Sequence, residues 1–183
     1  SYTVASHEYS YGYAVKNNKV YTLDAGHFHP TELISAKISA CLQFLDQVLL
    51  HVSRGVRWDS DHVITWDDEL QRIMDEVIHN QLENRVFIGL DYFDASINRI
   101  ACWVIGMRNA RKAILSAALV PVERIRQAER CGDLTSRLAL QEERKSLPVG
   151  AIWDYYCLKN NMPVGEDWLA QVKQYEKDVL SAR

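Results

Sequence analysis

VLLHV (48–52) and VFIGL (86–90) are two short runs of mainly apolar residues that lack the apolar–polar alternation of a half-exposed strand. Such runs are typical of strands buried on both faces, as in parallel sheets. Residues 20–24 form a third strand-like segment, which follows a turn at residues 16–19. The sequence therefore predicts three strands of a parallel sheet.

Helical periodicity separates these strands. A stripe of apolar residues covers residues 34–45, and residues 97–119 are strongly helical with an interruption expected near Gly106. A strand–helix order repeated three times predicts an α/β fold with right-handed crossovers. The clearest helix carries its apolar stripe at Leu70, Ile73, Met74, Val77 and Ile78.

The last third of the sequence has only helical patterns. Gly132, Pro148 and Pro163 divide it into three or four helices. We therefore expect an α/β part over residues 1–120 and a helical C-terminal extension over residues 121–183. Three parallel strands leave two open edges, and a closed (β/α)8 barrel takes about 250 residues. The sheet is therefore either small and open or the C-terminal part of a larger barrel.

Composition excludes several classes of protein. The 183 residues carry a formal net charge of -3 and no long Lys/Arg run, which argues against nucleic-acid binding. No apolar stretch reaches the roughly 18 residues that a membrane helix needs. P-loop, GxGxxG and GxSxG motifs do not occur. The four cysteines show no CxxC spacing, so we expect free thiols in a reducing cytoplasm.

Polar side chains gather where the predicted strands end. Ligands of α/β folds bind at the carboxyl ends of the strands, so we expect these groups at one mouth. A mixed His/Asp set suits Mn²⁺, Zn²⁺, Co²⁺ or Mg²⁺. In this interpretation one cation is held by His27, Asp59 and Asp61. The second is held by Asp24, His51 and Asp91.

Each of these residues also has an ordinary alternative role. An Asp at a strand end can cap a helix, His51 can be a core histidine, and the loop containing Asp59 and Asp61 can simply be solvated. The recurrence of such groups at three successive strand ends favours a metal site.

Several consecutive segments resemble the L-rhamnose isomerase family. They are LDAGHFHPTE (23–32), LLHVSR (49–54), VRWDSDH (56–62), IGLDYFDASINRI (88–100), LALQEE (138–143) and KSLP (145–148). The resemblance implies a (β/α)8 TIM barrel related to xylose isomerase, two divalent metal ions and a homotetramer. It implies interconversion of L-rhamnose and L-rhamnulose by a metal-assisted hydride shift.

The resemblance also implies roles for individual residues. The family's catalytic metal site corresponds to His27, Asp59 and Asp61. Its structural metal site corresponds to Asp24, His51 and Asp91, and Asp91 is a candidate to orient a metal-bound water.

Members of this family are far longer than this chain. The resemblance implies that the chain begins just after the fifth strand, so that an N-terminal half would add a metal-bridging Glu, a nearby Lys and the earlier strands. We therefore expect the 183 residues alone to be a poor or inactive isomerase. Two alternatives remain open: a different metal-dependent barrel enzyme, and a non-catalytic partial barrel that pairs with an N-terminal half.

Overall fold

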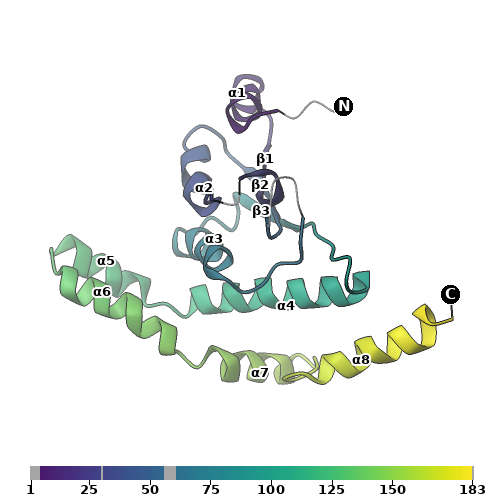
Figure 1. Ribbon diagram of the computed structural model, residues 1–183. Helices are drawn as coiled ribbons and strands as arrows, with labels where there is room; N and C mark the ends of the chain where they lie inside the picture. Colours follow the sequence, from purple (N-terminus) through teal and green to yellow (C-terminus); the bar gives the residue numbers. More distant parts are fainter. Residues whose placement is uncertain (1–4, 30, 56–60, 183) are drawn as a thin grey trace. The chain divides into compact units, whose positions relative to one another are not determined.

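Three parallel strands form the sheet of the computed structural model, which describes residues 5–29, 31–55 and 61–182. They lie in the order β1 (Tyr21–Asp24), β2 (Val48–Val52) and β3 (Val86–Leu90), as Figure 1 shows. The register pairs Asp24 with His51 and His51 with Gly89. The predicted α/β class with three parallel strands is confirmed.

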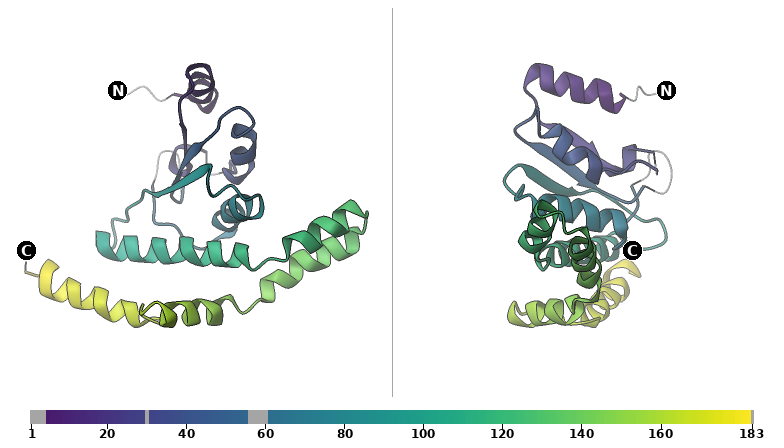
Figure 2. Two further views of the ribbon diagram at one scale, coloured as in Figure 1. Left: turned by 180° about the vertical axis from the view of Figure 1, so that it is seen from behind. Right: turned by 90° about the vertical axis from the view of Figure 1, so that its left-hand side faces the viewer.

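Two helices cover one face of this sheet. α2 (Ser35–Cys41) and α3 (Asp68–His79) lie on the same side of the strands (Figures 1 and 2). The first unit of the chain also contains α1 (His7–Asn17), the 3-10 turn η1 (Ala25–His27) and the start of α4 (Arg99–Ala118). The core between sheet and helices contains Leu23, Ile38, Leu50, Val52 and Met74, each at most 1% exposed.

The opposite face of the sheet is only partly covered by the described residues. Burial alternates along β2, and Phe87 on β3 is 48% exposed. The prediction of strands buried on both faces is therefore wrong for the described part of the chain. The apolar residues on this face are suited to a further layer, and the polar side chains of Asp24 and His51 also emerge here.

The helix α4 runs without a break through Gly106, contrary to the interruption expected there. Close packing against Tyr92 explains why a glycine occupies this position in the helix. Tyr92 is 5% exposed, and a β-carbon at Gly106 would overlap its ring and hydroxyl. Burial also raises the pKa of Tyr92 to about 12, so its hydroxyl stays neutral and donates to the Trp103 carbonyl at 3.5 Å.

We expect Gly106→Ala to destabilise the protein, although Ala is the better helix former by about 1 kcal/mol. The added methyl must displace the Tyr92 ring, and overpacking of this kind costs about 1–3 kcal/mol. Urea unfolding monitored by circular dichroism measures the change. Gly150→Ala on another helix is the control, because a β-carbon there meets no atom within 4 Å. A Gly106→Ala protein as stable as wild type would contradict the packing argument.

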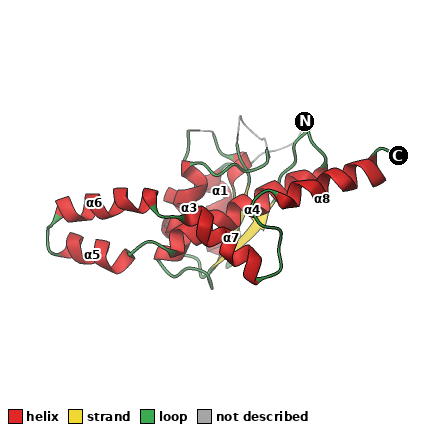
Figure 3. Cartoon of the chain, turned by 90° about the horizontal axis from the view of Figure 1, so that it is seen from below, coloured by secondary structure: helices red, strands yellow, loops and turns green. Residues whose placement is uncertain are grey.

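In the second unit, Arg111–Arg183, the described residues form helices joined by short turns and loops. The division between the two units falls inside α4, after Ala110, whereas the functional boundary at residue 120 stays a prediction. The elements of this unit after α4 are α5 (Val122–Arg130), α6 (Leu134–Glu143), η2 (Arg144–Ser146), α7 (Val149–Lys159), α8 (Asp167–Tyr175) and η3 (Glu176–Leu180). α5 and α6 form a hairpin whose turn uses the left-handed φ of 73° at Gly132 (Figure 3).

Among the described helices, none combines the length and the apolar character that crossing a bilayer requires.

Candidate metal centre

Asp24 and His51 are the centre of a polar cluster at the carboxyl ends of the strands. They are register partners on β1 and β2, so their side chains leave the sheet on the same face. Nδ1 of His51 lies 3.2 Å from Oδ2 of Asp24. Because an ionised carboxylate only accepts hydrogen bonds, Nδ1 is the donor, and the second ring nitrogen, Nε2, remains for another ligand.

His27 and Asp91 extend this cluster on either side. The Asp24 side chain accepts the Gly26 N–H at 3.0 Å, which caps η1 and turns His27 back toward the strand end. Nδ1 of His27 lies 3.8 Å from Oδ2 of Asp24, and Oδ2 of Asp91 lies 3.8 Å from Nδ1 of His51. Four of the predicted ligands are therefore joined by contacts shorter than 4 Å.

Asp61 approaches the cluster from the loop after β2. Ser53 donates from Oγ to Oδ1 of Asp61 at 3.0 Å. Burial raises the pKa of Asp61; the Ser53 hydrogen bond opposes this shift, the charges of Asp24 and Asp91 add to it, and His27 opposes it. The sixth predicted ligand, Asp59, lies outside the described residues.

The donor set fits a divalent cation in kind. Two imidazoles and three carboxylates from the ends of three strands are a mixed N/O set of the type that binds Mn²⁺ or Zn²⁺. Burial is the main cause of the raised pKa of Asp61, the nearby charges of Asp24 and Asp91 add to it, and a bound cation would oppose both effects. Within the ranges that the structure describes, no three His, Cys, Asp or Glu side chains already surround a common point as ligands.

The division into two metal sites stays a prediction. The structure links His27 to Asp24 rather than separating them, so the members of the two predicted sites belong to one continuous cluster. His29 and Asp94, which also follow strand ends, have local roles. His29 bonds the Thr31 hydroxyl at 2.7 Å, and Asp94 accepts from the backbone N–H and hydroxyl of Ser96.

Two residues that lie against Asp61 were not singled out from the sequence. Ser53 is only 8% exposed, and Gly26 is buried at a point where a β-carbon would overlap the Asp61 carboxylate. Ser53 directly follows a predicted strand, and Gly26 lies two residues after the end of another. Their position near strand ends is the signal in the sequence that could have drawn attention to them.

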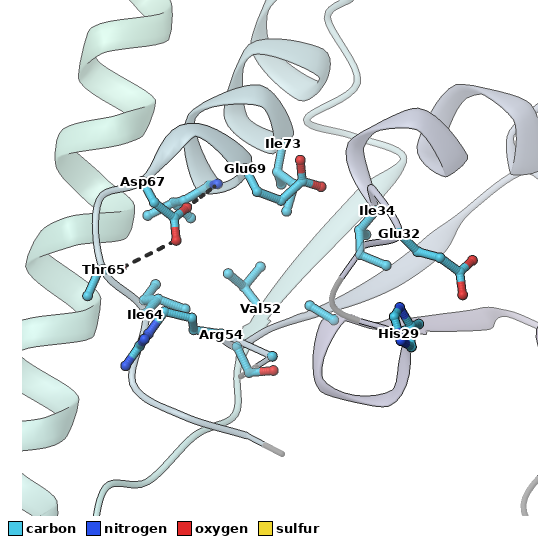
Figure 4. Close-up of a pocket in the computed structure, with 14 residues that line it drawn as sticks. His29, Glu32, Ile34, Val52, Arg54, Ile64, Thr65, Asp67, Glu69 and Ile73 are labelled. Atoms are coloured by element: carbon cyan, nitrogen blue, oxygen red, sulfur yellow. Dashed lines mark hydrogen bonds between the residues drawn. The ribbon is translucent and has the colours of Figure 1, made fainter. Parts of the chain in front are cut away.

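A pocket of about 170 Å³ lies next to this cluster, between the end of β2 and the first turns of α3. Figure 4 shows Val52, Ile64 and Ile73 among its apolar residues, with Asp67 and Glu69 entering from α3 and the residue before it. Asp67 caps α3 by accepting the Leu70 N–H at 2.9 Å, and Glu69 accepts from the N–H and hydroxyl of Ser35. Both carboxylates therefore already accept hydrogen bonds from groups of the protein.

Comparison with known proteins gives one consistent result. The family model described as L-rhamnose isomerase (RhaA) matches residues 1–183. Proteins named L-rhamnose isomerase from Rhodopirellula baltica, Mannheimia succiniciproducens and Escherichia coli are 61%, 60% and 57% identical over all 183 residues. The chain spans 43–44% of the length of these curated relatives, which agrees with a three-stranded sheet that is part of a larger barrel. From its first residue to its last, this chain belongs to the L-rhamnose isomerase family.

Proposed function

We propose that this chain is the C-terminal part of a metal-dependent aldose–ketose isomerase that interconverts L-rhamnose and L-rhamnulose. The observation that carries the proposal is the cluster of His and Asp side chains at three parallel strand ends in a chain of this family. The relatives' names supply the sugar. The proposed setting is carbohydrate catabolism in the cytoplasm.

Two divalent cations are the proposed cofactors, with Mn²⁺ first and Zn²⁺, Co²⁺ or Mg²⁺ as alternatives. Asp24, His51 and Asp91 would hold one of them. His27, Asp59 and Asp61 would hold the other. When bound, such cations supply Lewis acidity toward the carbonyl and hydroxyl oxygens of the open-chain sugar.

The chain's own residues prepare this site in three ways. Asp24 fixes the ring of His51 through the 3.2 Å hydrogen bond and holds η1 through the Gly26 N–H. His27, with a side chain 54% exposed, faces an accessible region where a substrate can reach it. Asp91 lies at the end of β3 with its side chain 66% exposed, and we assign it the role of orienting a water that exchanges a proton with a sugar hydroxyl.

The remaining parts of the active site are proposed to come from an N-terminal half of the barrel. The relatives are more than twice as long as this chain, which leaves room for the other strands, a metal-bridging Glu and a nearby Lys. We propose a homotetramer as the assembly.

The experiment that tests the function uses the purified full-length protein. After EDTA treatment it should produce no L-rhamnulose from L-rhamnose, and added Mn²⁺ should restore ketose formation. The 183-residue chain alone is the second arm and should be inactive or nearly so. A full-length protein that forms no ketose with any of the four cations, or that is fully active without metal, would contradict the proposal. Normal activity of the isolated chain would contradict the need for an N-terminal half.

A further inference from the structure

Three residues from separate segments meet beside the candidate metal centre. Gly26 belongs to the turn after β1, Ser53 follows β2 directly, and Asp61 comes from the next loop. The Ser53 hydroxyl donates to Oδ1 of Asp61 at 3.0 Å. A β-carbon at Gly26 would overlap that same carboxylate and would lie 3.0 Å from the Ser53 hydroxyl oxygen. The carboxylate therefore sits in a narrow place with one hydroxyl group directed at it.

The two oxygens of the Asp61 carboxylate are thereby distinguished. A carboxylate in a spacious, solvated place rotates freely, and either oxygen can meet a cation. Here the hydroxyl of Ser53 engages Oδ1, and the backbone of Gly26 limits rotation of the group. The second oxygen, Oδ2, can then serve a cation in a fixed direction, which lowers the entropy lost on binding.

We propose that Ser53 is a positioning residue of the metal centre, which holds Asp61 by Oδ1 so that its other oxygen meets the cation. This inference rests on the proposed function, because it assumes that Asp61 is a metal ligand. It assigns Ser53 a role toward the metal rather than toward the sugar.

The surroundings of Ser53 allow a sharp test. Ser53 lines the 170 Å³ pocket, so a slightly larger side chain has space there. Ser53→Thr keeps the hydroxyl and adds one methyl group. Ser53→Ala removes the hydroxyl and adds nothing. The pair therefore separates loss of the hydrogen bond from a change in size.

A matched control exists in the same unit. Ser35 donates its hydroxyl to Oε2 of Glu69 at 3.1 Å, so it also forms a partly buried serine–carboxylate hydrogen bond. Glu69 is not among the predicted metal ligands. Ser35→Ala therefore removes an equivalent hydrogen bond without touching the metal centre.

The experiment is a titration of the metal-free full-length protein with Mn²⁺, followed by electron paramagnetic resonance of the free ion. In Ser53→Ala the affinity for one Mn²⁺ ion should fall about 10- to 100-fold, as for other groups that orient a ligand. Ser53→Thr should restore binding to within a few-fold of wild type, and Ser35→Ala should bind as wild type does. The melting temperatures of metal-free Ser53→Ala and Ser35→Ala should be similar.

Two results would overturn the inference in different ways. If wild type binds Mn²⁺ and Ser53→Ala binds it equally tightly, Ser53 has no positioning role, and the proposed function is unaffected. If wild type binds no divalent cation, the proposed function fails together with the inference. A loss in Ser53→Ala that Ser53→Thr does not rescue, accompanied by a lower melting temperature of the metal-free protein, shows a purely structural role and also overturns it.

Discussion

Asp24→Asn is expected to lower the affinity for Mn²⁺ by more than about 100-fold and to reduce isomerase activity at least as much. Removal of a group that merely orients a metal ligand costs about 10- to 100-fold, and Asp24 is both a predicted ligand and the partner of two others. Its Oδ2 lies 3.2 Å from Nδ1 of His51 and 3.8 Å from Nδ1 of His27. Asn has almost the same shape but carries no charge, so the electrostatic attraction for the cation is lost.

The matched control is Asp94→Asn. Asp94 also follows β3 and is a carboxylate near the same mouth, but its hydrogen bonds go to the backbone and hydroxyl of Ser96. This variant should bind Mn²⁺ as wild type does. Mn²⁺ titration and the rate of L-rhamnulose formation measure both variants, and circular dichroism checks that they fold. Wild-type affinity in folded Asp24→Asn would show that this carboxylate is not a ligand.

The strands could be predicted almost to the residue. The apolar runs at 48–52 and 86–90 coincide with β2 and β3, and the first strand begins one residue later than expected. Their success has a physical basis, because short runs of β-branched and aliphatic residues between polar turns have few alternatives. The helical stripe at 70–78 succeeded for the same reason: four of its five residues are at most 4% exposed, and α3 is capped by Asp67.

The helices were harder to predict where tertiary contacts determine whether a helix forms or continues. Gly106 suggested an interruption by its low helix propensity, but the buried ring of Tyr92 needs a residue without a side chain at that place. α1 was not predicted, because its sequence shows no apolar stripe and only Ala14 is buried. The Gly106 result depends on a tertiary contact with Tyr92, which local spacing does not show, whereas α1 is held by local caps at Ser6 and Asn18 that an apolar stripe does not reveal.

In the candidate site, too, some residues could be predicted from the sequence and others could not. The positions of Asp24, His51 and Asp91 follow from the rule that parallel strands end at a common edge, and the structure brings His51 within 4 Å of both Asp24 and Asp91. Ser53 and Gly26 were missed because their importance depends on the approach of Asp61, which belongs to a loop without regular periodicity. The tertiary structure determines where the Asp61 loop approaches Ser53 and Gly26, so the sequence shows no pattern that predicts this contact.

Gly26→Ala is expected to weaken Mn²⁺ binding more than the loss of the Ser53 hydroxyl does. The new methyl group would occupy the place of the Asp61 carboxylate, so this group must leave its position and its hydrogen bond to Ser53. Gly26 also donates its N–H to Asp24, so a shift of its backbone would move a second predicted ligand. Overpacking of a buried position should in addition lower the free energy of unfolding by about 1–3 kcal/mol.

The contrast with Gly12→Ala makes this prediction specific. Gly12 lies inside α1, and a β-carbon there meets no atom within 4 Å, so alanine should leave Mn²⁺ binding unchanged and raise the stability by about 0.5–1 kcal/mol. Urea unfolding of the metal-free full-length protein and Mn²⁺ titration should therefore separate the two variants in opposite directions. If Gly26→Ala instead retained wild-type affinity, the carboxylate of Asp61 could not be bound to the cation in the position that the structure gives it. The steric contact with Gly26 thus tests the location of the metal centre independently of any change in its charged residues.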